Sequence, residues 1–294
     1  MTIFNLGSIN VDHFYDVPHL PGPGETLAAT GHHVGLGGKG ANQSIAAASG
    51  GANVVHIGAV GTDGDWAVDA LRKRRVNTDH VAVLDMPTGH AIINVDQAGE
   101  NTIVIFSAAN AAQDATRINA ALEQAVVGDV LLLQNETNLA EATAEVAQNR
   151  QMRVVYSAAP FDAEMAMDML PFTNLLVVNE VEAQQLSKTL GVSPAHLPVP
   201  EVLITRGSEG AVYRSGGKEI AVPAFAVKAV DTTGAGDTYL GFFVAGLDAG
   251  MDVKGAMTFA AAGAAIQVTR PGTADAIPGL TEVKAFLEER LINS

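Results

Sequence analysis

Short apolar runs alternate with amphipathic or alanine-rich segments along most of the chain. The apolar runs are bounded by Gly, Asn, Pro or charged residues and have the length of buried strands; they lie at 2–6, 54–60, 130–133, 154–156, 175–178 and 202–205. The segments between them have the length and spacing of helices; they lie at 41–49, 66–74, 115–125, 139–148, 163–170 and 180–190. Because strands that alternate with helices form parallel sheets, the pattern predicts an α/β fold with a doubly wound, mostly parallel sheet.

Two stretches interrupt this alternation. At 89–106, two apolar segments flank a polar turn at 96–100, which predicts a β-hairpin. At 12–36, extended segments surround a joint rich in Pro and Gly at 18–24. We expect a single α/β domain over residues 1–294, with a small inserted β-sheet lid formed by about 12–36 and 89–106.

Composition and charge narrow the class of protein. The chain has 294 residues, of which 48% are hydrophobic and 17% charged, as in a typical globular protein. Its net charge of −15 disfavours nucleic acid and anionic membranes as partners, because both carry negative charge. No apolar run has the length of a membrane span, no basic segment precedes the first apolar residues, and there is no cysteine. We therefore expect a cytoplasmic protein whose function depends on its local motifs.

The first glycine-rich element spans residues 35–43 and precedes a predicted helix. It formally matches a dinucleotide-binding fingerprint, with Asp63 about where the ribose-binding acid would lie, but it does not follow the first strand as that fingerprint requires. It also lacks two residues of a Walker A loop. Two interpretations stay open: a glycine turn before a helix, or bare backbone that approaches a polar ligand, with Lys39 and Asn42 as donors.

A second glycine-rich element, residues 231–237, runs directly into an apolar helix at 238–248. The unpaired N–H groups at the start of that helix would form an anion hole at residues 234–236. Asp237 lies in the first turn, where a carboxylate can simply complement the helix dipole. The same carboxylate is also suited to accept a hydroxyl proton during phosphoryl transfer.

Six motifs occur along the chain in an order that resembles the ribokinase-like (phosphofructokinase-B) sugar kinases. They are Gly7-Ser8-Ile9-Asn10-Val11-Asp12, Gly37-Gly38-Lys39-Gly40-Ala41-Asn42-Gln43, Asn179-Glu180-Val181-Glu182, Thr205-Arg206-Gly207-Ser208-Glu209-Gly210, the run at 231–237, and Val268-Thr269-Arg270-Pro271-Gly272. The resemblance covers essentially the whole chain. It implies a β lid that forms a homodimer contact, ATP as the phosphoryl donor, Mg²⁺, and K⁺ as an activating monovalent cation.

The resemblance also implies roles for individual residues. The residues expected to contact the sugar are Asn10, Asp12, Gly38, Lys39, Asn42 and Glu136. The residues expected at the reacting centre are Asp237 as the catalytic base and Gly234, Ala235 and Gly236 as the anion hole. The residues expected to bind the nucleotide are Asn179, Thr205, Gly207 and Gly236, with Glu182 organising Mg²⁺. The residues expected to hold K⁺ are Asp231, Thr233, Gln267, Arg270, Gly272 and Ala276.

Each of these side chains also has a purely structural interpretation. Asn10 and Asp12 could be turn formers, Glu182 part of a solvated helix face, and Lys39 a surface charge; their joint order favours a site. Two departures from the family pattern concern the nucleotide side. The segment 190–202 is too short and too rich in proline for the helix usual there, and a bulkier residue on the adenine-facing helix is replaced by Ala261 or Ala262.

These observations favour an ATP-dependent kinase that phosphorylates the terminal hydroxyl of a pentose, most simply O5 of D-ribose. Alternatives within the same class are a kinase for another free sugar, such as deoxyribose, fructose or a keto-sugar acid, and a nucleoside kinase. A phosphosugar substrate is disfavoured because 12–36 contains no Lys or Arg. The alternative from a different class is a non-catalytic sugar- or nucleotide-binding regulator, against which the intact Asp237 argues.

Overall fold

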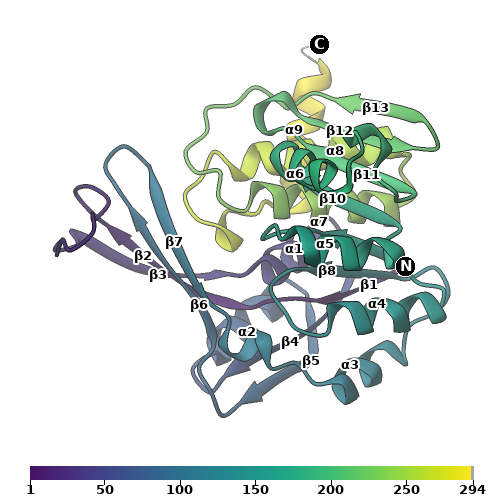
Figure 1. The fold of residues 1–294 in the computed structure, drawn as a ribbon. Helices are drawn as coiled ribbons and strands as arrows, with labels where there is room; N and C mark the ends of the chain where they lie inside the picture. Colours follow the sequence, from purple (N-terminus) through teal and green to yellow (C-terminus); the bar gives the residue numbers. More distant parts are fainter. Residues whose placement is uncertain (293–294) are drawn as a thin grey trace.

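The computed structural model describes residues 1–292 and contains two β-sheets (Figure 1). The larger sheet has nine strands in the order β13-β12-β11-β10-β9-β8-β1-β4-β5, and the smaller has four in the order β3-β2-β6-β7. The strands of the larger sheet are β1 (Thr2–Leu6), β4 (Asn53–Gly61), β5 (Asn77–Leu84), β8 (Val130–Gln134), β9 (Arg153–Ser157), β10 (Leu175–Asn179), β11 (Glu201–Thr205), β12 (Ala211–Ser215) and β13 (Lys218–Val222). Those of the smaller sheet are β2 (Asn10–Asp16), β3 (Gly31–Gly37), β6 (Gly89–Val95) and β7 (Asn101–Phe106).

Helices cover both faces of the larger sheet. One face packs against α1 (Lys39–Ser49), α2 (Asp65–Lys73), α7 (Ala235–Asp248), α8 (Val253–Gln267) and α9 (Leu280–Ile292). The other face packs against α3 (Ala115–Leu122), α4 (Ala140–Asn149), α5 (Ala163–Met169) and α6 (Glu180–Leu190). The predicted α/β fold with a mostly parallel, doubly wound sheet is therefore confirmed.

Strand β8 shows why the central strands are apolar throughout. Val130 and Leu132 belong to the hydrophobic cluster on one face, whereas Leu131 and Leu133 belong to the cluster on the other. Successive side chains of a strand point to opposite faces, so a strand covered by helices on both sides has no polar face. The continuous apolar run in the sequence follows from this burial.

The order of the strands reverses beside β1. This strand pairs in parallel with β4 on one side and β8 on the other. The chain first adds β4 and β5 and later builds β8 to β11 on the opposite side. Open α/β sheets bind ligands at the carboxyl ends of their strands where the order reverses. The residues after β1 and β8 are therefore placed at the position that this rule favours.

Elements at the ends of the larger sheet are missing from the pattern-based prediction. β5 forms one edge, and the antiparallel strands β12 and β13 form the other. Helix α9 was also not predicted. The proline-rich segment at 190–202 forms no α-helix, as expected, and contains one short 3-10 turn at Pro194–His196.

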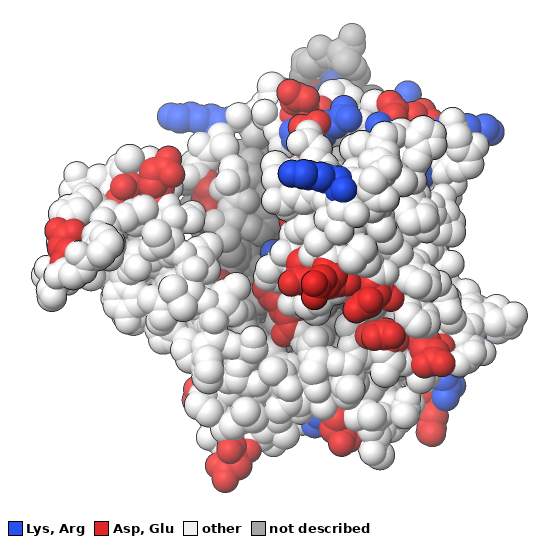
Figure 2. Space-filling view, in the orientation of Figure 1, with Lys and Arg blue, Asp and Glu red and all other residues white. Residues whose placement is uncertain are grey.

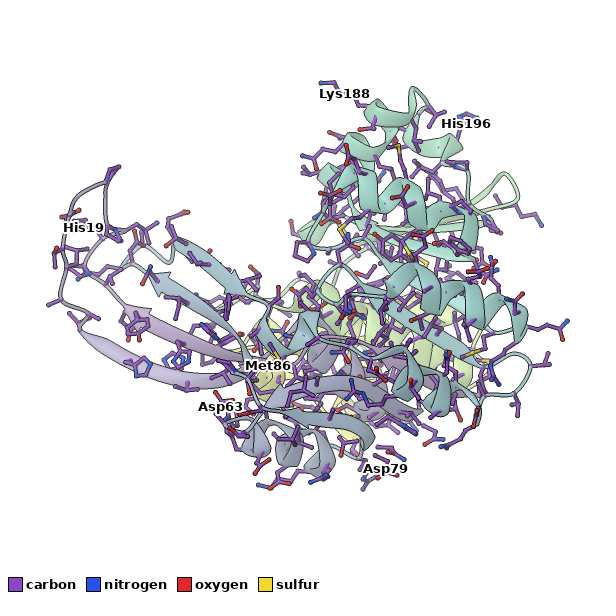
Figure 3. All side chains as sticks on the ribbon, turned by 60° about the horizontal axis from the view of Figure 1, so that its bottom comes forward. His19, Asp63, Asp79, Met86, Lys188 and His196 are labelled. Atoms are coloured by element: carbon purple, nitrogen blue, oxygen red, sulfur yellow. The ribbon has the colours of Figure 1, made fainter. Side chains whose placement is uncertain are left out.

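The smaller sheet projects from the side of the main body (Figure 1). His19 lies at its far tip, and Asp63 and Met86 lie where it joins the main body (Figure 3). Asp63 Oδ1 accepts hydrogen bonds from the N–H of Thr88 at 2.9 Å and from its hydroxyl at 2.6 Å. Asp63 therefore stabilises the junction of the two sheets through Thr88, and these hydrogen bonds do not involve the glycine-rich loop. Among residues 1–292, no helix is both long and apolar enough to cross a membrane.

Candidate functional site

The predicted sugar-contacting and catalytic residues converge at the carboxyl ends of β1 and β8. Asn10 and Glu136 follow these strands, Lys39 begins α1, and Asp237 lies in the first turn of α7. Figure 2 shows a hollow between the smaller sheet and the main body, with acidic atoms in it and beside it. This hollow is the candidate active site.

Glycine at position 38 allows α1 to begin directly against the loop after β1. Gly38 has a φ of 91°, in the left-handed region. A Cβ there would lie 2.8 Å from Ser8 O and 2.9 Å from Asn10 N, which is too close for any side chain. The glycine therefore brings Lys39 and the loop after β1 into one site.

Glu136 joins the loop after β8 to the start of α1. Its Oε2 accepts a hydrogen bond from the Lys39 N–H at 3.0 Å and another from the Ser8 hydroxyl. Burial raises the pKa of the Glu136 carboxyl. The side chain is thus held in place by two donors and lies beside the other candidate sugar-binding groups.

Asn110, which lies outside the sequence motifs, orients Asn10. Asn110 Nδ2 donates to Asn10 Oδ1 at 2.7 Å, and Asn110 Oδ1 accepts from the Ile9 N–H at 2.9 Å. Because its oxygen is already bonded, Asn10 presents its amide N–H groups to a ligand.

Asp12 places a buried carboxylate in the site. It is 6% exposed, and its carboxylate lies against the backbone of Gly37, so closely that a Cβ at that position would overlap it. No side-chain or backbone donor in residues 1–292 forms a hydrogen bond with it. Burial, together with the nearby charges of Glu136 and Asp237, raises the pKa of Asp12 to about 7. A ligand that donates hydroxyl hydrogen bonds would relieve this unfavourable environment.

Asp237 is held by two amide side chains from α1. Gln43 Nε2 donates to Oδ1 at 2.8 Å, and Asn42 Nδ2 donates to Oδ2 at 3.3 Å. Asp237 is 8% exposed and lies at the first turn of α7. Each carboxylate oxygen therefore has one donor and keeps a lone pair for a reacting group.

Gln43 is in turn held by a buried chain of side-chain hydrogen bonds. Gln134 Nε2 donates to Gln43 Oε1 at 2.7 Å and to Asn5 Oδ1 at 2.9 Å. Asn5 Nδ2 donates to Ser44 Oγ at 2.8 Å, which lies 2.8 Å from His56 Nδ1. Burial lowers the pKa of His56 to about 4, so its ring is neutral at pH 7. This chain determines the direction of each amide and sets Gln43 to donate to Asp237.

Lys39 supplies the positive charge of the site. The carboxylate of Asp237 makes the largest contribution to raising the pKa of its ammonium group, ahead of Glu136 and Glu182, while burial opposes the rise. The ammonium group therefore stays charged among three carboxylates. This environment disfavours the simple interpretation of Lys39 as a solvated surface charge.

The start of α7 has the open N–H groups of an anion hole. The helix begins after Gly234, which has a φ of 76°, and no side chain caps it. Its first intrahelical hydrogen bond runs from the Thr238 N–H to Gly234 O at 2.9 Å. In the described part of the chain, the N–H groups of Gly236 and Asp237 have no acceptor, so they can receive an anion. Ala235 was also predicted to contribute, but its N–H donates to Thr232 O at 3.2 Å.

An apolar cavity of about 410 Å³ opens on the other side of this helix start. The predicted nucleotide residues Thr205, Gly207 and Gly236 line it, and Ala261 from α8 forms part of its wall. Small side chains at that wall leave room for a flat ring, and apolar walls with a few polar groups are typical of small-molecule sites.

Asn179 and Glu182 lie at the start of α6 and bond to each other. The Glu182 N–H donates to Asn179 Oδ1 at 2.9 Å, and the Asn179 N–H donates to Glu182 Oε2 at 2.7 Å. This capping box explains why both residue types occur at this spacing. One carboxylate oxygen of Glu182 remains outside the capping box, and burial raises the pKa of this carboxyl.

The residues expected to hold K⁺ lie around the loop before α7 and the loop after α8. Asp231 Oδ1 accepts from the Thr233 N–H at 2.9 Å, and its Oδ2 accepts from the Gly272 N–H at 3.0 Å. Gln267 Nε2 donates to Thr233 O at 2.8 Å and to Gly272 O at 3.3 Å. The amino group of Gln267 thus lies between the carbonyls that a cation would have to bridge. The donor set of this arrangement does not fit a bound monovalent cation.

The two other residues of that set have different surroundings. The Arg270 guanidinium pairs with Glu282 at the start of α9. Ala276 ends a short turn whose neighbouring carbonyls, those of Ala274, Asp275 and Ile277, accept from the Arg74 guanidinium.

A family model described as "pfkB family carbohydrate kinase" matches residues 2–279 of the chain. The chain belongs to the pfkB family. It is 35% identical over 302 residues to the ribokinase of Haemophilus influenzae, and the match covers 98% of each protein. Among solved structures, it is similar to the ribokinase of Thermotoga maritima, with a TM-score of 0.86, 33% identity and coverage of 98% of this chain and 99% of that one. It is also similar to Arabidopsis thaliana ribokinase complexed with ribose and ATP, with a TM-score of 0.84, 26% identity and 98% coverage of both.

Membership of this carbohydrate kinase family confirms the resemblance inferred from the ordered motifs. The structure adds supporting residues that the motifs did not single out: Ser8, Gln43, Asn110 and Gln134. Ser8 and Gln43 lie within quoted motifs, so their positions carried a signal. Asn110 and Gln134 lie outside them, and nothing in the local sequence marks them.

Proposed function

We propose that this chain transfers the γ-phosphate of ATP to the O5 hydroxyl of D-ribose. The observation that carries the proposal is the position of Asp237, between a polar group of side chains on one side and an apolar cavity on the other. The similarity to ribokinases, including one solved with ribose and ATP, supports the same pair of substrates.

The polar side suits a molecule with several hydroxyl groups. Asn10 offers amide donors, Asp12 offers a carboxylate without a protein donor, and Lys39 offers an ammonium group. A sugar hydroxyl can both donate and accept, so it can bridge such neighbours. Ribose would also supply the hydrogen-bond donors that the buried Asp12 lacks.

The reaction needs one proton transfer and one exchange of bonds at phosphorus. Asp237 accepts the proton of the O5 hydroxyl as that oxygen forms a bond to the γ-phosphorus, and the bond from this phosphorus to the leaving oxygen of ADP breaks. The N–H groups of Gly236 and Asp237 stabilise the negative charge on the transferred group. Gln43 and Asn42 keep the carboxylate turned toward the hydroxyl.

The nucleotide belongs in the apolar cavity lined by Thr205, Gly207 and Ala261. From there its phosphates can reach the start of α7. Glu182 would organise Mg²⁺, because one of its carboxylate oxygens is free of the capping box. This ion binds through few protein oxygens and keeps several waters, so a single carboxylate suits it. When bound, it would neutralise charge on the phosphates.

A screen of acceptors tests this proposal. ADP release would be measured with pentoses, hexoses and nucleosides in the presence of ATP and Mg²⁺. We expect D-ribose to give the highest kcat/KM, and 5-deoxyribose, which lacks the accepting hydroxyl, to inhibit without being phosphorylated. Preference for another sugar or a nucleoside would overturn the substrate assignment. Binding of ribose and ATP without turnover would favour a non-catalytic regulator.

We also propose that the smaller sheet closes over the sugar and forms the contact of a homodimer. Its outer strand β7 exposes consecutive apolar residues: Ile103, Val104, Ile105 and Phe106. An exposed apolar strand is unfavourable for an isolated sheet edge, and pairing with a second copy would cover it. Light scattering should give the mass of a dimer, and Val104→Asp should shift the protein toward the monomer. A monomeric wild type would exclude this contact.

A further inference from the structure

Gln267, the last residue of α8, connects two loops that are distant in sequence. Its side chain is fully buried, with 0% of the residue exposed. Its Nε2 donates to Thr233 O at 2.8 Å in the loop before α7 and to Gly272 O at 3.3 Å in the loop after α8. A single amino group therefore holds together two backbone carbonyls from different parts of the fold.

The direction of this amide follows from its neighbours. Both nearby atoms are carbonyl oxygens, which can only accept, so the nitrogen of the amide must face them. Gln267 Oε1 is buried and has no hydrogen-bond partner among residues 1–292. The amide therefore stabilises the loops through its donors, while its acceptor is unsatisfied.

The same two loops are joined a second time through Asp231. Its carboxylate accepts from the N–H groups of Thr233 and Gly272, the residues whose carbonyls Gln267 bonds. Asp231 thus binds the N–H groups of these two residues, and Gln267 binds their carbonyl oxygens. Further along the second loop, the Arg74 guanidinium takes up three more carbonyls. Side chains of the protein itself supply the positive charge or polarity that these carbonyls attract.

This bracing is adjacent to the anion hole. Thr233 directly precedes Gly234, after which α7 begins with the open N–H groups of Gly236 and Asp237. Movement of the Thr233 carbonyl would tilt the first turn of the helix. Catalysis by aligned N–H groups is sensitive to small displacements of those groups. The hydrogen bonds of Gln267 therefore influence turnover although Gln267 touches neither substrate.

We propose that the Gln267 amide takes the place of a monovalent cation, holding the loops around the anion hole so that this chain needs no K⁺ for phosphoryl transfer. The proposal rests on the kinase function proposed above. Gln267 acts as a positioning residue through Thr233. Its removal should leave a gap between two carbonyls and a carboxylate, which is a ligand set suited to K⁺. The Gln267→Ala variant should therefore gain a dependence on K⁺ that the wild type lacks.

The test compares initial rates and melting temperatures with and without KCl. Ionic strength is held constant at about 0.1 M with tetramethylammonium chloride, so that screening does not change. Gln148→Ala is the matched control, because Gln148 Nε2 also donates to a backbone carbonyl, that of Pro171 at 3.1 Å, but does so at the exposed surface. We expect neither the wild type nor this control to respond to KCl.

The expected result for Gln267→Ala is a loss of about 10- to 100-fold in kcat without K⁺ and recovery of most of it with KCl. Its melting temperature should also rise with KCl. If that variant does not fold, Gln267→Glu provides a second test: its carboxylate repels the carbonyls unless a cation bridges them, so KCl should raise its melting temperature.

Several results would overturn the proposal. One is a wild type that KCl activates strongly. Another is a Gln267→Ala variant that is fully active without K⁺, or one that folds but responds to KCl in neither rate nor melting temperature. The melting temperatures need no turnover, so they decide the role of Gln267 even if ribose proves not to be the substrate.

Discussion

Replacing Asp237 by asparagine should remove the proton acceptor and keep the surrounding structure. Gln43 Nε2 donates to Asp237 Oδ1, and Asn42 Nδ2 donates to Oδ2. In the variant, the amide oxygen can still accept from Gln43. The new amino group can donate to Asn42 once the Asn42 amide turns over, because Asn42 Oδ1 is buried and lacks a partner among residues 1–292. We therefore expect Asp237→Asn to fold and to bind ribose and ATP.

The magnitude of the effect follows from the role of the lost group. A positioned general base contributes about 10²- to 10⁴-fold, so kcat should fall by this factor. The corresponding loss of transition-state stabilisation is about 3 to 5 kcal/mol. The N–H groups at the start of α7 belong to the backbone and remain in the variant, so residual turnover should be measurable.

The assay separates binding from chemistry. Initial rates of ADP release give kcat and KM, and calorimetry gives the Kd for ribose and for ATP. Asp69→Asn is the control, since Asp69 is an exposed carboxylate that pairs with Arg72 on α2. Turnover of Asp237→Asn near the wild-type rate would show that Asp237 is not the base and would leave it as a residue that complements the helix dipole.

Three further predictions concern the supporting residues. The pKa of Asp12 is raised to about 7, so its ionisation destabilises the folded state as pH rises from about 4 to 7. Asp12→Asn should therefore raise the free energy of unfolding by up to about 4 kcal/mol at pH 8 and by less at pH 5. Urea titrations at the two pH values check this, and equal gains would contradict it. Gln43→Leu should lower kcat about 10- to 100-fold with little change in KM for ATP, because Asp237 loses its shorter hydrogen bond. Steady-state kinetics measure both constants, and an unchanged kcat would argue that Gln43 does not position Asp237. Gly38→Ala should lose about 1 to 3 kcal/mol of stability from backbone strain alone, and its affinity for ribose should fall, since its Cβ would meet Ser8 O. Thermal unfolding and calorimetry test this, and a stable variant that binds ribose would contradict the close approach.

The central strands could be predicted from the sequence because they are buried on both faces. Val130 to Leu133 is apolar at every position, since alternate residues enter two different hydrophobic clusters. The edge strands have no such pattern. β13, at Lys218–Val222, is mostly exposed and carries charged residues, so neither its composition nor its alternation indicates a strand.

The candidate site could be predicted where one local segment carries the chemistry. The position of Asp237 in the first turn after a glycine-rich loop is visible in the sequence. The chain of hydrogen bonds from His56 through Asn5 and Gln134 is not, because it joins side chains from separate strands and helices.

Gln267 shows the same limit for the predicted cation site. The sequence places this residue near the end of an apolar helix, and the resemblance implies that a cation is bound there. Only the structure shows that its amide points inward to Thr233, which lies 34 residues earlier in the chain. Side-chain direction across such a separation depends on tertiary packing, which a linear pattern does not contain.

The phosphorus NMR spectrum of the product shows which hydroxyl of ribose receives the phosphate. The wild-type enzyme would be incubated with ATP, Mg²⁺ and D-ribose, and the proton-coupled signal of the new phosphate ester recorded. A phosphate on O5 is attached to a CH₂ group, so we expect a triplet from coupling to two protons. A doublet, which indicates transfer to a hydroxyl on a ring carbon with one proton, or the absence of any ester signal while ADP accumulates, would contradict it.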